Sequence, residues 1–495
     1  MEPSVIIIVA IIILYWVSIE ILKKRGILER RNITAIGPIL MIRSVRVLNL
    51  LDRFSKPKKF WKITSTLGIL VTFIGMFFML SLIILMDIVL LTSPPEPSAL
   101  THPRNILLIP GINEFIPLVW GIIGLIVTLV VHEFSHAIIC RVENVRVKSL
   151  GVLLALVPIG GFAEPDEEDI KKANVMQRLR IYSAGIMSNF IVALIAFLMF
   201  IHLLGYLTPH IVVVESNVVE KGSVILSVNG VEVHNQEELD KVLKLANEKV
   251  VIEVRYKNGT IEKLELNKIA GVYITGIWKG YPAEKAGLRE GMVIVKVDDV
   301  ETPTLKSFIE VMKSTKPNQT ISVYAYDGER IRVFNVTLVR APSNGHGFIG
   351  VYIGGDYLSG MILGYSDQVL VSLQSIPSNL MHVKGWLSLV AMPLLFRGFG
   401  DEITNYFTPT GFWENYGELL FYILNTLYWI GWLNFYIGLF NCLPAIPLDG
   451  GRILRDTLSS LLGDRLSESI VKLLTTIIFL SIIMSILIPN LKLIL

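Results

Sequence analysis

Six long apolar stretches limit what this chain can fold into. They cover residues 4–22, 66–92, 115–140, 183–207, 419–441 and 470–488. Each is close to or longer than the roughly 20 apolar residues that a helix needs to cross the hydrocarbon core of a bilayer. Because 52% of the residues are hydrophobic and only 18% are charged, the chain lacks the charges that a water-facing surface requires. The sequence predicts a polytopic α-helical membrane protein with about six transmembrane helices.

Basic residues predict the orientation of these helices. The segment between the first two stretches holds twelve lysines and arginines, from Lys23 to Lys62, and the positive-inside rule places such a segment in the cytoplasm. The first stretch carries its positive charges after the apolar run, so it is expected to remain as an anchor and not to be a cleavable signal peptide. The N-terminus and the polar segment 209–345 are then predicted to be extracytoplasmic. The short apolar run within 385–400 favours an interfacial or re-entrant segment.

The composition also excludes some partners and roles. The net charge of +3 is small, and no basic tract is interleaved with aromatic residues, so no nucleic-acid partner is expected. The two cysteines, Cys140 and Cys442, cannot form a disulfide framework. Both lie in apolar surroundings, where packing is the expected role.

The polar segment contains an internal repeat. GSVILSVNGVEV, which begins at residue 222, recurs as GMVIVKVDDVET from residue 291, a shift of 69 residues. Each copy is expected to combine alternating apolar strands with one helix, at 237–246 or 305–314, and a hairpin. The hairpin turns fall at Asn258-Gly259 and Asp327-Gly328. The sequence therefore predicts two copies of one small α+β module.

The two modules resemble the PDZ domain in the circularly arranged form of prokaryotic proteases. The resemblance rests on GVYITGIWKGYPAEKAGLREGMVIVKVDD (271–299) in the second copy, whereas the first copy has no segment like PAEKAGL. PDZ domains bind chain ends or extended peptides by adding a strand to a sheet edge. The resemblance thus implies a pair of PDZ-like domains with peptide partners. A purely structural spacer remains the alternative for the first copy.

Two histidines and a glutamate lie inside the third apolar stretch, in TLVVHEFSHAII (128–139). On a helix, His132 and His136 share one face, so both rings can reach one zinc ion at about 2.0–2.1 Å, with Glu133 beside them. Ionisable side chains at mid-membrane cost at least about 2.5–3.5 kcal/mol and are usually functional. The HExxH pattern is typical of zinc metalloproteases. Histidines that only hydrogen-bond neighbouring helices are the alternative.

A catalytic zinc needs a third protein ligand and one open position. Ile139 and Val142 occupy the positions that the extended HExxHxxGxxH pattern would require, and the glutamates at 164, 167 and 168 lie in a polar loop. Asp449 is a better candidate, because it is the only acidic residue between Glu418 and Asp456 in a strongly apolar run. Nearby prolines and glycines predict an irregular turn that presents it to a cavity. Capping the following helix is its alternative role.

These motifs resemble those of the site-2 proteases, a family of intramembrane zinc metalloproteases. The family's HExxH is matched at His132–His136, and its N-x-x-P-x-x-x-L-D-G is matched from Asn441 to Gly450. The resemblance covers about residues 115 to 460. It implies that His132, His136 and Asp449 hold one zinc ion. It also implies that Glu133 is the general base that takes a proton from the attacking water.

Two further segments match the family and suggest residues that bind substrate. SAGIMSNF (183–190) resembles the start of the family's middle core helix, where Asn189 is expected to orient substrate or solvent. VPIGGFAEP (157–165) resembles a loop that folds in the family as a re-entrant β-hairpin. Gly160 and Gly161 would let an extended substrate approach and pair with this loop. Asn441 of the second motif is also expected to contact substrate.

The resemblance implies an intramembrane zinc metalloendopeptidase that cleaves transmembrane helices of membrane proteins after another protease has trimmed them. Its partners would be a membrane-spanning substrate, a peptide or chain end at the PDZ-like domains, and the lipid bilayer. A zinc transporter or a non-catalytic PDZ scaffold is the alternative, although a transporter should show ionisable groups along a path and not at one depth. The expected domains are an N-terminal membrane region 1–110, a first catalytic half 111–208, PDZ-like domains 209–267 and 268–345, and a second catalytic half 346–495.

Overall fold

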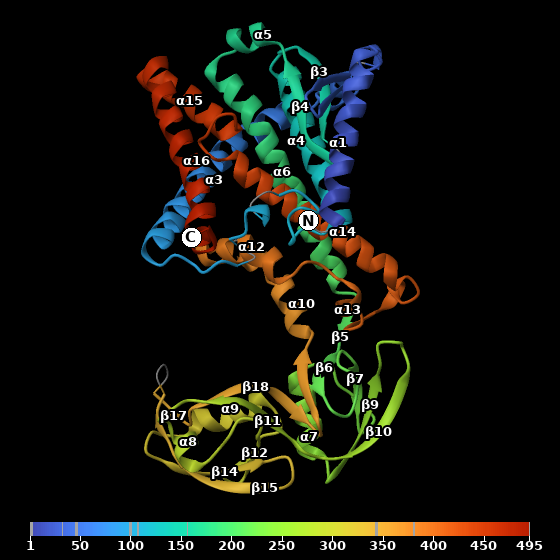
Figure 1. Cartoon of the computed structure of the whole chain (residues 1–495), viewed down its shortest axis with the longest axis vertical. Coiled ribbons are helices and arrows are strands. Elements are labelled where there is room, and N and C mark those ends of the chain that lie inside the picture. Colours follow the sequence, from blue (N-terminus) through green and yellow to red (C-terminus); the bar gives the residue numbers. More distant parts are fainter. Residues whose placement is uncertain are drawn as a thin grey trace. The chain divides into compact units, whose positions relative to one another are not determined.

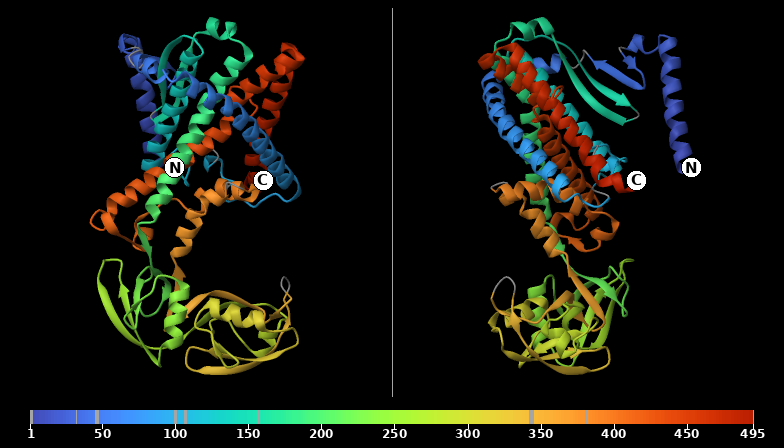
Figure 2. Two further views of the ribbon diagram at one scale, coloured as in Figure 1. Left: turned by 180° about the vertical axis from the view of Figure 1, so that it is seen from behind. Right: turned by 60° about the vertical axis from the view of Figure 1, so that its left-hand side comes forward.

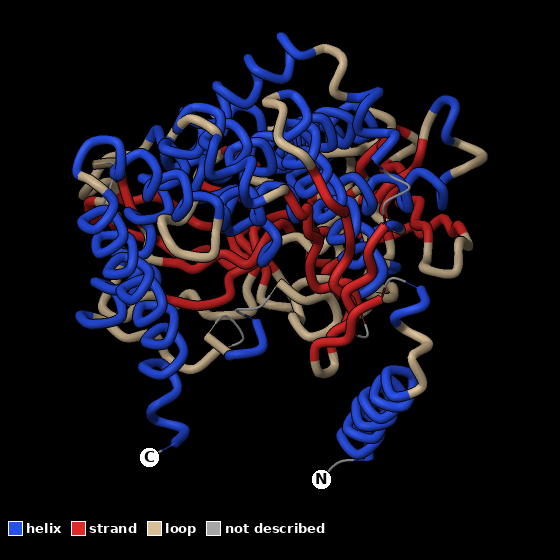
Figure 3. Tube along the Cα trace, turned by 90° about the horizontal axis from the view of Figure 1, so that it is seen from above, coloured by secondary structure: helices blue, strands red, loops and turns tan. Residues whose placement is uncertain are grey.

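The chain forms two compact units. The computed structural model describes residues 3–31, 33–44, 48–98, 101–105, 108–155, 157–341, 345–379 and 382–494. The helical unit comprises Met1–Phe200, Val390–Gly398 and Ile423–Leu495, and the strand unit comprises Ile201–Leu389 and Phe399–Tyr422. Figure 1 labels many elements of both units, and Figure 3 shows helices in blue and strands in red.

Long apolar helices make up most of the helical unit. Among the described residues, four are long and apolar enough to cross a membrane: α3 (Lys58–Thr92), α4 (Leu118–Val142), α6 (Val175–Leu204) and the Asp464–Asn490 part of α16. The predicted spans at 4–22 and 419–441 are also helical, as α1 (Pro3–Lys24) and α14 (Gly417–Asn441). The total of six spans stays a prediction. The segment predicted to be interfacial, 385–400, overlaps α12 (Val383–Leu395), which has Pro393 inside it. The remaining helices of this unit include α2 (Leu48–Phe54), α5 (Glu167–Lys172), α15 (Asp449–Leu462) and α16 (Asp464–Ile494).

The core of the helical unit surrounds both motif segments. Cys140, Ile186, Cys442 and Ile453 belong to one cluster of buried residues that joins α4, α6 and α15. Both cysteines are free and fully buried, so the prediction that they serve packing is confirmed. Burial of this apolar surface holds the two motif segments against each other.

A four-stranded antiparallel sheet lies against α4. Its order is β1 (Ile33–Ile36), β2 (Ile39–Ser44), β3 (Val147–Ala155) and β4 (Val157–Pro165). Figure 2 shows the blue β1–β2 hairpin beside the teal β3–β4 hairpin. Residues 157–165, predicted to fold as a hairpin, form instead the single strand β4, which is the second arm of a β3–β4 hairpin that begins at Val147. This hairpin continues a sheet that the N-terminal region begins. Because β4 pairs only with β3 among the described strands, its second edge is free.

The strand unit is built from two equivalent halves. Its large sheet has the order β10-β9-β7-β6-β19-β18-β11-β12-β14-β15 among the described strands. The first half therefore reads 10-9-7-6-19 and the second half 15-14-12-11-18 from the outside inward. The predicted helices are confirmed as α7 (Gln236–Leu245) and α9 (Leu305–Ser314). The first half consists of β6 (Ile211–Ser216), β7 (Val224–Val228), β9 (Lys249–Arg255), β10 (Ile261–Asn267) and β19 (Met361–Tyr365). The second half consists of β11 (Ala270–Ile277), β12 (Val293–Val297), β14 (Thr320–Tyr326), β15 (Ile331–Thr337) and β18 (Val351–Leu358).

The sheet extends past residue 345, where the second module was predicted to end. The central strands β18 and β19 cover residues 351–365 and pair with each other through the short hairpin at Leu358 and Met361. The sequence repeat stops before β18 and β19. These two strands form one hairpin that gives a central strand to each half, and the sequence has no second copy of that hairpin. The second half is thus inserted into the first, between β10 and β19.

A buried carboxylate ties the two halves together. Asp356 on β18 is 1% exposed and accepts hydrogen bonds from Gln236 Nε2 (2.8 Å), from the Leu305 backbone N–H (2.6 Å) and from the Tyr365 hydroxyl. Gln236 begins α7 and Leu305 begins α9. Burial raises the pKa of Asp356, while these donors favour its charged form. The two helices therefore share one anchor at the centre of the sheet.

His210 lies in a second buried polar cluster, between β5 (Leu207–Pro209) and β6. His210 is 5% exposed, and its Nε2 lies 2.6 Å from Thr408 Oγ1. Arg255 Nη1 donates to the same hydroxyl oxygen at 3.0 Å, which leaves the Thr408 proton for the imidazole. Burial, followed by the charges of Arg255 and His234, lowers the pKa of His210 to about 4. The structure thus favours a neutral His210.

We expect this cluster to make stability depend on pH. The unfolded chain takes up a proton on His210 near its ordinary pKa of 6.5, whereas the folded chain does so only near 4. As pH falls from about 6.5 to about 4, the free energy of unfolding should decrease by about 3 kcal/mol. Thermal unfolding of the full chain at several pH values would measure this loss. His210→Gln should flatten that part of the profile, and an unchanged profile would contradict the assignment.

Candidate metal centre

Three side chains from two distant segments meet inside the helical unit. His132 and His136 project from α4, and Asp449 is the first residue of α15. Asp449 Oδ2 lies 3.1 Å from Nε2 of each histidine, and the two Nε2 atoms are 3.1 Å apart. In the part of the chain that the structure describes, this is the group whose spacing fits a metal ion. The predicted convergence of the two motifs is therefore present in the geometry.

The donor set fits zinc. Two imidazole nitrogens and one carboxylate oxygen point toward a common centre, and His132 and Asp449 are 7% and 6% exposed. Three such ligands leave a fourth tetrahedral position free for a reacting group. Helix capping does not explain Asp449, because Leu448 is the N-cap of α15 and the Asp449 carboxylate faces the histidines. A shared cation accounts for a carboxylate held this close to two imidazoles in apolar surroundings.

Glycines make room for the three ligands. A Cβ atom at Gly185 on α6 would lie 2.5 Å from His136 Nε2 and 2.6 Å from His132 Nε2. A Cβ atom at Gly450 would lie 2.3 Å from the Cys442 carbonyl oxygen. Real Cβ atoms do not come this close, so only glycine lets α6 and the turn before α15 pack against the centre. Both positions fall within motifs that the sequence pointed to.

A second set of contacts orients the histidine rings. His136 Nδ1 lies 2.7 Å from the Ile181 carbonyl oxygen, and His132 Nδ1 lies 3.1 Å from the Asn189 side-chain amide. If His132 offers Nε2 to a metal, its Nδ1 carries the hydrogen, and the amide oxygen of Asn189 is then the acceptor. Asn189 was predicted to bind substrate. The structure instead places it fully buried behind His132.

The centre opens into a cavity of about 260 Å³. Glu133, Gly161 and Asn441 line it together with the three ligand residues, as the sequence predicted. Gly160 and Asn189 do not belong to its lining. The residues of the lining that were not predicted as site residues include Ala163, Tyr182 and Arg452. Tyr182 precedes Gly185 by three residues and Arg452 follows Asp449 by three, so helical spacing alone could have placed both on the site's face.

The free edge of β4 faces this cavity. The Ala163 backbone N–H donates to Glu133 Oε2 at 2.7 Å, so Ala163 points its backbone groups away from β3. Neighbouring residues of an antiparallel strand alternate in this respect. Gly161 therefore presents its N–H and C=O at the same edge, whereas Gly160 and Phe162 use theirs on β3. A Cβ atom at Gly161 would lie 2.6 Å from Glu133 Cγ, which explains the glycine there.

We expect Asn189→Ala to weaken metal binding without unfolding the protein. Loss of a hydrogen bond that orients a ligand usually lowers metal affinity by about 10- to 100-fold. Competition with a chelator, read as zinc retained per chain, would measure the change. Asn434→Ala is a matched control, because Asn434 is also a fully buried asparagine of the helical unit but bonds only the Ile430 carbonyl among the contacts of the described residues. Equal zinc retention by Asn189→Ala and the wild type would contradict the role.

Comparisons with known proteins identify the family of the chain. The sequence model of Peptidase family M50 matches residues 120–485. An uncharacterized protein of Methanocaldococcus jannaschii is 32% identical over 262 residues, which cover 51% of this chain and 67% of that protein. Protease RseP of Yersinia pestis is 23% identical over 438 residues, covering 71% of this chain and 93% of RseP. The regulator of sigma E protease of Haemophilus influenzae is 22% identical over 424 residues, covering 70% and 92%.

The solved structures that match part of the chain include a PDZ domain. The PDZ domain of an SdrC-like protein from Listeria monocytogenes is 22% identical, with a TM-score of 0.16, and covers 17% of this chain and 88% of that domain. The family match is far more extensive, since it spans more than half of the chain and includes His132, His136 and Asp449. The family implied by the sequence motifs is thereby confirmed. The chain belongs to Peptidase family M50, the site-2 proteases, and is a metalloprotease.

Proposed function

We propose that this protein is an intramembrane zinc endopeptidase that hydrolyses peptide bonds within transmembrane helices of other membrane proteins. The observation that carries the proposal is the convergence of His132, His136 and Asp449, with Glu133 lining the same cavity. The two histidines and Glu133 belong to a helix long and apolar enough to cross a membrane. A site of this kind is accessible to a peptide that is itself in the bilayer.

The chain's own groups suffice for the proton transfers of hydrolysis. Zinc held by His132, His136 and Asp449 would polarise the scissile carbonyl and activate water. The Glu133 carboxylate accepts a proton from the attacking water and returns it to the leaving amine nitrogen. Asn189 and the Ile181 carbonyl oxygen keep the two rings in their orientation throughout. Burial of the site excludes bulk water from the other bonds of the substrate.

A substrate helix must unwind before it can be cut, because its carbonyls are otherwise engaged in helical hydrogen bonds. The free edge of β4 supports an extended peptide, since Gly161 and Ala163 direct backbone groups into the cavity. Asn441 and Leu448 also line this cavity. Strand addition at β4 would therefore replace the lost helical bonds and hold the peptide next to the metal ligands.

The strand unit is proposed to bind the end of a trimmed substrate. In its second half, residues 351–355 of β18 pair with β11 but not with β19, which leaves an edge for a peptide strand near α9. In the first half, three of the five residues of β19 pair with β18. The corresponding edge is thus mostly occupied, in keeping with the spacer alternative for that half. Prior cleavage by another protease would supply the chain end that the second half takes.

The orientation in the membrane follows from the charge pattern. The positive-inside rule places the basic segment 23–62 in the cytoplasm. With multiple membrane crossings, the strand unit and the N-terminus are then extracytoplasmic. The HExxH end of α4 then lies toward the cytoplasm.

The central test separates metal binding from proton transfer. Detergent-purified protein should cut a labelled single-span substrate. Glu133→Gln should retain zinc and lower the cleavage rate by about 10²- to 10⁴-fold, the usual contribution of a general base. Asp449→Ala should lose zinc together with activity, measured by metal analysis of the same samples. Cleavage by Glu133→Gln at the wild-type rate would exclude Glu133 as the general base. Absence of cleavage by the wild type would favour a transporter or scaffold.

A second test concerns the free edge of β4. Ala163→Pro removes the N–H that faces the cavity but no ladder hydrogen bond, and proline is tolerated at such edge positions. We expect zinc content and thermal stability to be kept, with kcat/KM reduced by about tenfold, because the variant loses both the hydrogen bond to Glu133 and the donor that an extended peptide would use. Phe162→Pro is the matched control, because it removes an N–H that faces β3 and should lower stability. Unchanged cleavage by Ala163→Pro would exclude strand pairing there.

A further inference from the structure

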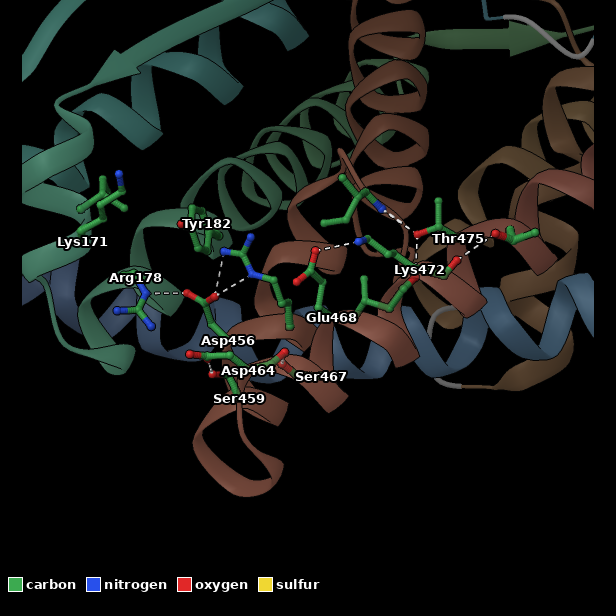
Figure 4. A pocket seen from close by; sticks show the side chains of 15 residues that line it. Lys171, Arg178, Tyr182, Asp456, Ser459, Asp464, Ser467, Glu468, Lys472 and Thr475 are labelled. Carbon is green, nitrogen blue, oxygen red and sulfur yellow. Dashed lines mark hydrogen bonds and ion pairs between the residues drawn. The ribbon is translucent and has the colours of Figure 1, made fainter.

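A charged cavity lies beside the metal centre, with Tyr182 in the lining of both. It has a volume of about 900 Å³, within the range of ligand-binding pockets. Figure 4 shows its side chains, which come from α5, α6, α15 and α16 and from Ile446 in the turn before α15. Its charged lining residues are Lys171, Arg178, Arg455, Asp456, Asp464, Glu468 and Lys472. The proposed hydrolysis makes no use of any of them.

A buried ion-pair network forms one wall of this charged cavity. Asp456 is 4% exposed. Its Oδ2 lies 2.6 Å from Arg178 Nε, and its Oδ1 lies 2.9 Å from Arg455 Nη2. Figure 4 shows Arg178 and Asp456 facing each other, with Tyr182 close by. Two guanidinium groups on one carboxylate leave a net positive charge in the wall.

Tyr182 and Arg452 connect this cavity with the metal centre. Tyr182 lines both cavities, and Arg452 lines the metal cavity with its guanidinium carbon 5.7 Å from the centre of the Tyr182 ring. The charges that act on the Tyr182 hydroxyl are Asp456, Arg452, Arg455 and Arg178. Three cations thus oppose one anion at the wall between the cavities. Arg452 is exposed and has no acidic partner among the residues that the structure describes.

We propose that the charged cavity binds the substrate polypeptide beside the cut, and that Arg452 receives a carboxylate of that polypeptide. This inference rests on the proposed function. The carboxylate has two sources, an acidic side chain in the polar segment that flanks the membrane helix or the new C-terminus that hydrolysis creates. Either source would meet an unpaired guanidinium next to the metal cavity, where an ion pair with a carboxylate forms readily.

The lining favours a peptide over a lipid phosphate. Asp456, Asp464 and Glu468 bring three carboxylates to a wall with four cations, so little net positive charge remains to attract a doubly or singly charged headgroup. The lining also offers the hydroxyls of Ser459, Ser467, Thr475 and Thr476, which suit the mixed donors and acceptors of a polypeptide backbone. Arg452, the cation without an acidic partner among the described residues, lines the metal cavity, where the peptide bond would be cut.

The experiment compares matched ligands in neutral phosphatidylcholine vesicles. Two single-span substrates would differ only in their flanking segment, acidic in one and with the corresponding amides in the other. Two labelled product peptides would differ only in a C-terminal carboxylate or carboxamide, and their binding, read by fluorescence anisotropy, requires no cleavage. The variants are Arg452→Gln and Arg452→Lys, with Arg465→Gln as control. Arg465 is an exposed arginine of α16 outside both cavities.

We expect Arg452→Gln to weaken one carboxylate ligand by about fivefold, the worth of one partly exposed ion pair. A raised KM for the acidic substrate alone identifies the flanking side chain. Weaker binding of the carboxylate peptide alone identifies the new C-terminus. Arg452→Lys should recover most of the loss, and Arg465→Gln should match the wild type. Zinc content and thermal stability report on folding in every variant.

Three results would overturn the inference. Arg452→Gln could leave all four ligands unchanged, it could weaken carboxylate and amide ligands equally, or its effect could occur only when anionic phospholipid is added. The last result would assign the charged cavity to a lipid headgroup. Failure of the wild type to cut either substrate would instead count against the proposed function, and the peptide-binding arm would still test Arg452.

Discussion

A single carboxylate held between two imidazoles inside an apolar helix bundle is the constraint on which the helical unit depends. Asp449 Oδ2 is 3.1 Å from both His132 and His136, and none of these groups would be stable unpaired in such surroundings. The polar groups can be kept there only if α4 and α15 meet at one point. That requirement explains the close packing of α6 at Gly185 and of the turn at Gly450. The cluster of buried residues around Cys140 and Cys442 then supplies the apolar burial that keeps the segments together.

The sheet beside α4 links the N-terminal region to the catalytic residues. The β1–β2 hairpin lies before the part of the chain that the family model matches, yet it pairs with β3. A two-stranded hairpin is marginally stable by itself, whereas three or more strands packed on a helix can hold a fixed edge. The added strands therefore stabilise the position of β4, whose Ala163 backbone N–H donates to Glu133. This gives a structural role to residues that lie outside the family's core.

The sequence predicted the elements whose signal is local. The HExxH spacing on one helix face, the solitary Asp449 and the repeated strand pattern each depend on neighbouring residues, and each has its counterpart in the structure. Long-range pairing left no such signal. Asn189 was predicted to bind substrate. Nothing in SAGIMSNF indicates that its side-chain amide would instead contact His132, which lies 57 residues earlier in the chain. The central strands β18 and β19 were missed because they have no repeated copy, and the pairing of β2 with β3 joins segments over 100 residues apart.

The insertion of one half of the strand unit into the other has a consequence for how the chain folds during synthesis. The first half cannot complete its sheet when residue 267 emerges, because its inner strand β19 is made only after the whole second half. Until then β6 would expose an unpaired edge, a state that favours pairing with other chains. The second half, in contrast, is contiguous from β11 to β18. It can therefore fold first. The β18–β19 hairpin then offers β19 as the strand with which β6 of the first half pairs.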